Sequence, residues 1–202
     1  MKTYPSIPST VSQGTRIIAF DKIDGSNIRA EWSKKRGFYK FGTRKRLLGE
    51  DEHPLGEAVG IIRSKYDKDL SDIFKKLRIQ SAICFFEFWG EHSAFGFHCD
   101  EPHDVTLFDV NLFKQGIMFP KEYFKTFGKL DIALKLYEGN CNSDFINSVR
   151  FGSLEGMGSE GVVCKAPGHH MQPLMFKIKR DSWYNRLREH CRGDVNLFKE
   201  LA

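Results

Sequence analysis

The residues FDKIDGSN, Phe20 to Asn27, join two strand-like runs, and the predicted fold is organised around this junction. The run before it, 16–20, is apolar, and the run after it, 27–32, alternates, which predicts a strand on each side of an Asp-Gly turn. Lys22 at such a junction is held on rigid backbone while its amine stays free to react. A lysine becomes a nucleophile when burial or nearby positive charge lowers its pKa. The stretch therefore indicates covalent catalysis, although an ordinary Asp-Gly hairpin with a solvated lysine has the same pattern.

The composition is that of one soluble globular domain. The chain has 202 residues, 41% of them apolar and 28% charged, and is long enough to bury a substantial core. No apolar run approaches the roughly 18 residues of a membrane helix, and residues 1–13 lack the apolar centre of a secretory signal, so we expect a cytoplasmic protein with no membrane partner. A net charge of +5, with basic clusters at 34–36, 44–46 and 177–180, favours a polyanionic partner, although each cluster alone is typical of a solvated loop.

The cysteines do not predict a disulfide framework, because the five of them are odd in number and widely spaced. Reduced, mostly buried thiols are the better interpretation. His98 and Cys99, with His103 nearby, could suggest a metal site. Without a paired Cys-x-x-Cys motif this pattern does not predict zinc.

Hydrophobic periodicity divides the rest of the chain into strands and helices. Residues 1–15 are polar and contain Pro5 and Pro8, which predicts an extended arm. Strands are predicted at 16–20, 27–32, 38–41, 82–89, 105–113, 130–137, 159–165 and 175–179. Helices are predicted at 57–78, at 120–127, at about 144–150 with Ser143 as its cap, and once or twice in the tail 182–201. The apolar face of the long helix is formed by Tyr66, Leu70, Ile73, Phe74 and Leu77.

Charged residues within two of these strands indicate a site. Glu87 lies in a run of buried aromatic residues, where a carboxylate costs free energy unless it has a partner. The alternative is an edge position at which Glu87 points to water. Lys177 and Lys179 lie two residues apart on the last strand, so they share one face and repel each other unless an anion lies between them.

The ordered set of motifs resembles that of the covalent nucleotidyltransferase superfamily, which comprises ATP-dependent DNA and RNA ligases and GTP-dependent mRNA capping enzymes. The motifs are Lys22-Ile23-Asp24-Gly25, Glu87, Phe108-Asp109, Glu160-Gly161-Val162-Val163 and Lys177-Ile178-Lys179. The resemblance covers about residues 16–180 and is closest to RNA ligases of the phage RNA ligase 2 and editing ligase type, because Asn27 stands where DNA ligases usually carry arginine. The run KIKRDSWY at 177–184 is similar to phage RNA ligase 1.

The resemblance implies an α+β fold in which antiparallel β-sheets, flanked by helices, form a nucleotide-binding cleft. This is the ligase and capping-enzyme nucleotidyltransferase fold, which is ATP-grasp-like. We expect residues 1–180 to be the nucleotidyltransferase domain and residues 181–202 to be a helical tail packed on it. The fuller ligases and capping enzymes carry an OB-fold or helical domain after this one, whereas we expect only a helical tail here, and whether a partner protein supplies the function of that domain stays open.

The resemblance also implies a reaction. Lys22 would attack the α-phosphate of ATP, form a lysyl-AMP and release pyrophosphate. The AMP would pass to the 5′-phosphate of an RNA strand, and a 3′-hydroxyl would displace it to join the ends, as in RNA repair. Because phosphoryl transfer depends on positioning and on neutralising charge, lysines and Mg²⁺ or Mn²⁺ suit it, and the same cations are expected to lower the pKa of Lys22.

Roles for the other residues follow from the resemblance alone. Glu87 would bind the ribose, Phe108 would stack on adenine, and Lys177 and Lys179 would contact the α-phosphate. The remaining nucleotide-site residues would be Asn27 near the phosphates, Arg44 at the AMP or the strand's 5′-phosphate, Asp21 and Ile23 beside the lysine, Glu160 as a metal ligand and Asp109 in substrate or metal contacts.

Three alternatives stay open. A minimal ATP-dependent DNA ligase differs from an RNA ligase in its need for a 2′-hydroxyl, which the sequence does not locate. A GTP-dependent capping guanylyltransferase differs in its nucleotide. A non-catalytic nucleic-acid-binding module would keep the fold without turnover. Whether the substrate is a nicked duplex or single-stranded ends is likewise open.

Overall fold

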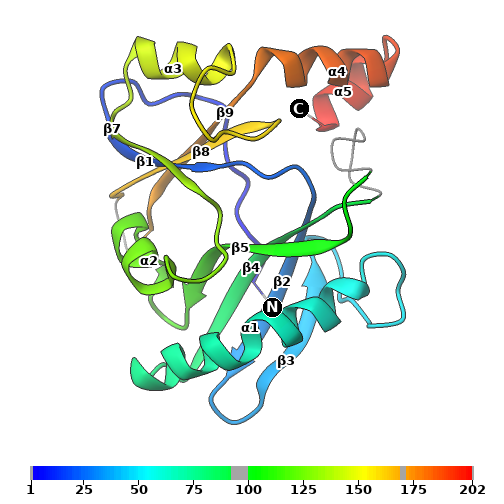
Figure 1. Ribbon diagram of the computed structural model, residues 1–202, viewed down its shortest axis with the longest axis vertical. Coiled ribbons are helices and arrows are strands. Elements are labelled where there is room, and N and C mark those ends of the chain that lie inside the picture. Colours follow the sequence, from blue (N-terminus) through cyan, green and yellow to red (C-terminus); the bar gives the residue numbers. More distant parts are fainter. Residues whose placement is uncertain (1, 92–99, 169–171, 202) are drawn as a thin grey trace.

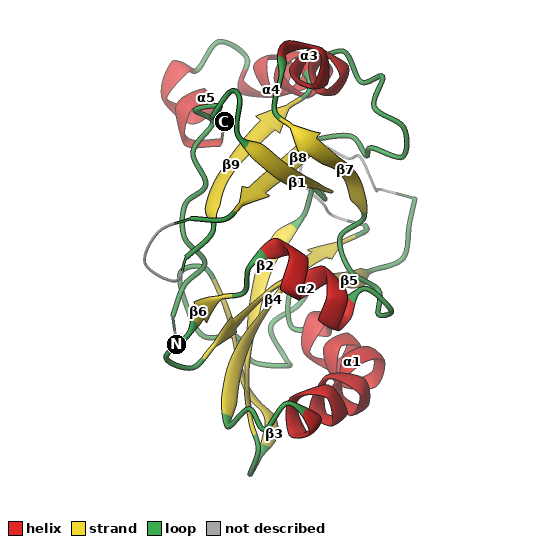
Figure 2. Cartoon of the chain, turned by 90° about the vertical axis from the view of Figure 1, so that its left-hand side faces the viewer, coloured by secondary structure: helices red, strands yellow, loops and turns green. Residues whose placement is uncertain are grey.

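The computed structural model describes residues 2–91, 100–168 and 172–201. Two antiparallel β-sheets lie one above the other in Figure 2, and we call them the upper and the lower sheet. Three helices lie above the upper sheet, whereas the other two flank the lower sheet (Figures 1 and 2). This arrangement confirms the predicted α+β class with antiparallel sheets flanked by helices.

Most predicted strands are confirmed to within two residues. The upper sheet has the order β7-β1-β8-β9, from β1 (Arg16–Asp21), β7 (Lys135–Asn140), β8 (Gly161–Ala166) and β9 (Leu174–Lys179). The lower sheet has the order β3-β2-β4-β5-β6, from β2 (Ser26–Ser33), β3 (Gly37–Thr43), β4 (Ser81–Trp89), β5 (Asp104–Leu112) and β6 (Gly116–Ile117). The chain first passes from one sheet to the other between β1 and β2, which is the junction that contains Lys22.

The predicted strand at 130–137 is displaced, because β7 begins only at Lys135. The residues before it carry the chain back from the lower to the upper sheet. The amide of Ala133 donates to the carbonyl of Leu107 at 2.9 Å, and the amide of Asp21 donates to the carbonyl of Leu134 at 2.8 Å. The alternating apolar pattern therefore belongs partly to a crossing that contacts both sheets rather than to one continuous strand.

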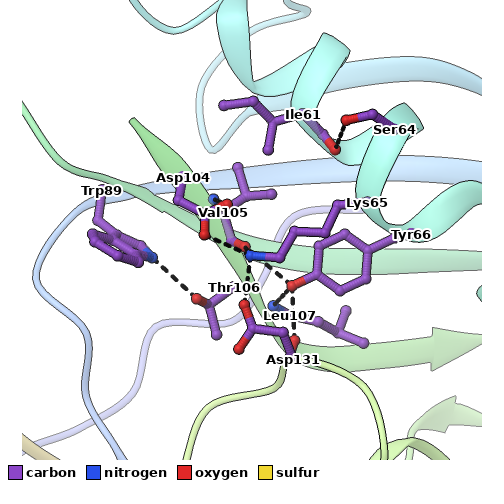
Figure 3. A network of polar contacts seen from close by, with 10 residues as sticks. All are labelled: Ile61, Ser64, Lys65, Tyr66, Trp89, Asp104, Val105, Thr106, Leu107 and Asp131. Carbon is purple, nitrogen blue, oxygen red and sulfur yellow. Dashed lines mark hydrogen bonds and ion pairs between the residues drawn. The ribbon is translucent and has the colours of Figure 1, made fainter. Parts of the chain in front are cut away.

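A polar network fixes this crossing against α1 (Glu57–Lys76), as Figure 3 shows. The ammonium of Lys65 lies 2.6 Å from a carboxylate oxygen of Asp104 in β5 and 2.5 Å from one of Asp131 in the crossing. The hydroxyl of Tyr66 donates to the carbonyl of Asp131 at 2.7 Å. One turn of α1 thereby holds the lower sheet and the crossing together.

The apolar face of α1 packs against the lower sheet, together with α2 (Pro120–Phe127). Tyr66, Leu70 and Phe74 are buried as predicted. Leu77 is 50% exposed, because α1 ends at Lys76, two residues before the predicted end. This core determines which face of the lower sheet remains available for a site.

The upper sheet is covered by α3 (Ser143–Arg150). Its cap is Asn142 rather than the predicted Ser143, since the Asn142 side chain accepts a hydrogen bond from the amide of Phe145 at 2.9 Å. The tail forms α4 (Asp181–Cys191) and α5 (Val195–Leu201), and Trp183, Leu187 and Cys191 of α4 are buried in a small cluster against α5.

Within the described ranges, no helix is both long and apolar enough to cross a membrane. Cys84, Cys141, Cys164 and Cys191 are buried free thiols. Of the residues considered for a metal site, His98 and Cys99 lie outside the described residues, and His103 lies 2.7 Å from a carboxylate oxygen of Glu57.

Candidate active site

A cleft of about 810 Å³ lies between the two sheets. Its walls come from the β1–β2 junction, the basic loop 43–46, the strands β4, β5, β8 and β9, and the arm. The volume falls within the ~300–1,000 Å³ typical of ligand sites. Ten of the eleven residues singled out from the sequence line it, namely Asp21, Lys22, Ile23, Asn27, Arg44, Glu87, Phe108, Glu160, Lys177 and Lys179.

The backbone around Lys22 is fixed on both sides. The amide of Lys22 donates to the carbonyl of Gly161 at 2.9 Å, which extends the pairing of β1 with β8 by one residue. At Gly25 the turn passes so close to β4 that a Cβ atom would lie 2.3 Å from the carbonyl oxygen of Phe88. The turn therefore requires glycine, and the Lys22 side chain, 24% exposed, projects into the cleft from a rigid base.

Glu160 lies between two lysines at the centre of the cleft. One of its carboxylate oxygens is 2.7 Å from the Lys22 ammonium, and the other is 3.0 Å from that of Lys179. Glu160 directly precedes β8, and Lys179 ends the neighbouring strand β9, so strand pairing brings them together. Lys177 lines the same cleft two residues earlier on β9, as the shared strand face predicts.

The carboxylates determine the protonation of Lys22. Burial lowers the pKa of its amine, but Glu160, Glu87 and Asp24 together raise that pKa above the ordinary value of a lysine. The expectation that neighbouring cations lower the pKa of Lys22 is therefore wrong for this arrangement. The lowered values are found elsewhere in the cleft: burial lowers the pKa of Lys179 to about 8, and burial together with Lys22 lowers the pKa of Lys177.

Glu87 is a half-buried acid that faces the cleft beside Asn27, its partner across the pairing of β2 with β4. Burial raises the pKa of Glu87 to about 8, against the smaller opposing effect of Lys22. A carboxyl group that titrates near neutral pH can both donate to and accept from a hydroxyl group. The alternative position, an edge residue pointing to water, is excluded because β4 is a central strand of the lower sheet.

Phe108 reaches the cleft because β5 contains a β-bulge. The register between β4 and β5 shifts at this point, so that Phe85 pairs with Asp109 and Phe86 with Leu107. Phe108 is the extra residue and has no partner in the ladder. A bulge redirects side chains, and here Phe108 lines the cleft while one side of it packs against the core that buries Leu107.

Asp109 is the one predicted residue that the structure does not bring into the cleft. Its side chain is fully buried, and one carboxylate oxygen is 2.7 Å from the Tyr4 hydroxyl and 2.8 Å from the Lys165 ammonium. Lys165 also donates to the carbonyl of Phe108 at 3.0 Å. Asp109 therefore supports the backbone beneath Phe108 and does not face a substrate or metal.

Tyr4 and Lys165 were missed in the sequence, although both line the cleft. Lys165 lies in the β-branched strand β8, so the reasoning that identified Glu87, a charge within a buried strand, applies to it equally. Tyr4 lies in a polar segment that predicts no core residue, and no sequence signal identified it.

Arg180 was also missed, and it holds the loop before Glu160. Its guanidinium donates to the carbonyl of Gly158 at 3.0 Å, and its amide donates to the carbonyl of Glu160 at 3.0 Å. On the other side the amide of Gly158 donates to a carboxylate oxygen of Asp21 at 2.8 Å. Asp21 and Arg180 thus fix the position of Glu160 from both sides.

No protein-family model and no curated protein sequence matches this chain. Solved structures do match. One is Naegleria gruberi RNA ligase with pyrophosphate, with a TM-score of 0.64 and 14% identity over 88% of this chain and 53% of that chain. A variant of the same ligase with ATP and Mn matches with a TM-score of 0.62 and 14% identity over 85% of this chain and 51% of that chain. A variant in the apo state matches with a TM-score of 0.64 and 14% identity over 92% of this chain and 59% of that chain.

The chain thus spans just over half the length of these ligase structures. At this level of identity the likeness concerns the fold. The chain therefore has the nucleotidyltransferase fold of RNA ligase.

Proposed function

We propose that this chain is an ATP- and divalent-cation-dependent RNA ligase, with residues 1–180 as its nucleotidyltransferase domain. One observation carries the proposal: a lysine fixed at a strand end shares a carboxylate with a second lysine, inside a ligand-sized cleft. Support comes from the fold, because the matching Naegleria gruberi structures are of an RNA ligase with ATP, AMP or pyrophosphate.

The chemistry proposed for Lys22 is nucleophilic attack. Its amine attacks the α-phosphorus of ATP, a P–N bond forms, and the P–O bond to pyrophosphate breaks. The 5′-phosphate of an RNA strand then attacks the same phosphorus and releases the amine. Finally a 3′-hydroxyl attacks the activated 5′-phosphorus, and AMP leaves. Lys177 and Lys179 place positive charge beside the oxygens on which negative charge develops.

The amine of Lys22 must lose its proton before it attacks. In the structure Glu160 accepts a hydrogen bond from the protonated amine and favours the charged form. Lys179 is the other partner of Glu160 and has a pKa of about 8, so it can take up or release a proton at little cost. We infer that Lys22 becomes nucleophilic when the charge of Glu160 is engaged by a cation.

The residues fit a divalent cation of the Mg²⁺ or Mn²⁺ type. The described part of the chain has no cluster of three metal-ligating side chains. Mg²⁺ is usually bound by one or two carboxylates together with substrate phosphates, and Glu160 supplies one such carboxylate. When bound, the cation would neutralise phosphate charge.

Glu87 and Phe108 form the nucleoside end of the proposed site. Glu87 carries a carboxyl group suited to a ribose hydroxyl, and Phe108 presents an aromatic ring on which adenine would stack. At the cleft mouth the exposed residues Arg44, Lys45 and Arg46 offer a basic surface for the phosphates of an RNA end. We propose RNA ends, joined 3′-hydroxyl to 5′-phosphate, as the substrate.

A sealing assay tests this proposal. The substrate is a nick with a 3′-hydroxyl and a 5′-phosphate in a duplex, offered with RNA or with DNA at the nick and with ATP or GTP. We expect sealing of the RNA nick with ATP and no sealing by Lys22→Ala. Because a pre-adenylylated 5′ end bypasses the attack by Lys22, the Lys22→Ala protein should still seal that end. Preference for DNA or for GTP would replace the proposal with the corresponding alternative, and no sealing of any end would contradict it.

A further inference from the structure

The arm, residues 2–15, is anchored by one side chain. Tyr4 is the only fully buried residue of the arm, at 5% exposure. Its hydroxyl lies 2.7 Å from a carboxylate oxygen of Asp109 in β5 and 3.4 Å from the sulfur of Met175 in β9. Since β5 belongs to the lower sheet and β9 to the upper, one tyrosine connects both walls of the cleft.

The ring of Tyr4 supports Phe108. It meets the Phe108 ring edge to face, with centroids 4.9 Å apart and an angle of 86° between the ring planes. It makes a similar contact with Phe85, also at 4.9 Å. Phe108 sits on a β-bulge without a ladder partner of its own and is only partly buried against the core, so the contacts with its ring neighbours contribute to its orientation.

The backbone of the arm follows the same wall. The amide of Lys177 donates to the carbonyl of Pro8 at 2.9 Å, so the arm runs beside β9, the edge strand of the upper sheet. Between these two anchors Ser6 and Ile7 line the cleft. The arm is therefore part of the cleft wall at the end where Phe108 lies.

We propose that Tyr4 is a positioning residue for the nucleoside end of the site. It holds the Phe108 ring in place for base stacking and makes no contact with Lys22, Lys177 or Lys179 at the phosphate end. The inference rests on the proposed function for the nature of the ligand, a purine nucleotide. The inference separates two parts of nucleotide binding: the affinity for the base should depend on Tyr4, and the affinity for the phosphates should not.

Equilibrium binding of two ligands tests this separation. The first is α,β-methylene-ATP, which carries the base but cannot release pyrophosphate, and the second is inorganic tripolyphosphate, which has no base. Calorimetry is done with the whole chain, unchanged and as Tyr4→Ala, Tyr4→Leu, Tyr4→Phe and, as the control on an exposed arm residue, Thr10→Ala.

We expect Tyr4→Ala and Tyr4→Leu to bind α,β-methylene-ATP about tenfold more weakly, the loss that corresponds to misplacing an aromatic pair. Tyr4→Phe keeps the ring and should lose about twofold to threefold, and Thr10→Ala should lose nothing. The affinity of every variant for tripolyphosphate should stay within about twofold of that of the unchanged chain, a change smaller than the loss of one weak hydrogen bond would cause.

Thermal unfolding of each variant shows whether it is folded. If Tyr4→Ala does not fold, the affinity of Tyr4→Leu, whose side chain fills most of the space left by the tyrosine, tests the inference. Unchanged affinity for α,β-methylene-ATP in a folded variant overturns the inference, and so does an equal loss for both ligands. If the unchanged chain binds the analogue but forms no AMP adduct from ATP, the proposed function fails while the role of Tyr4 is still decided. If it binds no analogue, both fail.

Discussion

Replacing Glu160 by glutamine changes the charge balance of the cleft while preserving its shape. The carboxylate is 4% exposed and lies between the ammonium groups of Lys22 and Lys179, at 2.7 and 3.0 Å. Glutamine keeps two polar atoms in the same place but removes the negative charge. Two buried or half-buried cations then lose a shared partner, and the free energy of unfolding should fall.

The contribution of Lys179 to that loss has a ceiling set by its pKa of about 8, lowered from 10.5 by burial. At pH 7, one unit below this pKa, deprotonating Lys179 in the folded protein costs about 1.4 kcal/mol. Because the lysine can release its proton instead of staying charged without a partner, the loss of Glu160 cannot cost more than that. Lys22 keeps Glu87 and Asp24 as neighbours and is partly solvated, so we assign it about 1–2 kcal/mol. Glu160→Gln should therefore destabilise the fold by about 2–3 kcal/mol at pH 7.

The dependence on pH distinguishes this account from simple damage. Because the folded pKa of Lys179 is depressed, its ammonium is present in the folded state below about pH 8 and absent above it. The loss should therefore be largest near pH 6 and about 1 kcal/mol smaller at pH 9 than at pH 7.

Urea unfolding of the unchanged chain and of Glu160→Gln at pH 6, 7, 8 and 9 measures this loss, and Glu155→Gln, an exposed residue of the same loop, is the matched control. A loss that stays constant from pH 6 to pH 9, or one no larger than that of the control, would refute the reasoning.

Three further predictions concern other parts of the site and fold. The pKa of Glu87 is about 8 in the folded protein against 4.5 in the free side chain, so the folded state binds this proton more tightly than the unfolded state. The free energy of unfolding should therefore fall as the pH rises from about 4.5 to about 8. Urea unfolding of Glu87→Gln over the same pH range should show a shallower fall. Gly25→Ala places a methyl group 2.3 Å from the carbonyl oxygen of Phe88, so AMP attachment, followed by intact mass, should slow by at least about tenfold; an unchanged rate would show that the β1–β2 junction tolerates a shift. Asn142→Ala removes the cap of α3 and should cost about 1 kcal/mol in urea unfolding while leaving AMP attachment unchanged, because α3 lies on the face of the upper sheet away from the cleft.

Local patterns predicted much of this fold. Strand periodicity and turn residues located seven strands, because each has its own alternation or a dense β-branched run. The crossing at 130–134 was misread, since an apolar segment that contacts two sheets has the same alternation as a strand paired within one. The cap of α3 was misplaced by one residue because Asn142 and Ser143 are both good caps, and only the geometry chooses between them.

For the site, too, local sequence predicted some features, and others depend on contacts between residues far apart in the chain. Glu87 and the pair Lys177 and Lys179 stand out in the sequence because a charge in a buried strand needs an explanation. The raised pKa of Lys22 could not be predicted, because it depends on the 2.7 Å contact with Glu160, a residue 138 positions away in the chain. Tyr4 and the burial of Asp109 were equally out of reach, since the two residues become partners only when the arm folds over β5.

The central claim is that Lys22 forms a covalent bond to AMP. Intact-mass spectrometry of the purified chain, incubated with Mg²⁺ and either ATP or GTP, tests it most directly, with Lys22→Ala as the control. We predict a mass gain of one AMP with ATP alone, mapped by peptide analysis to Lys22 and absent from Lys22→Ala. A folded protein that gains no mass from either nucleotide, or an adduct that persists in Lys22→Ala, would contradict the claim.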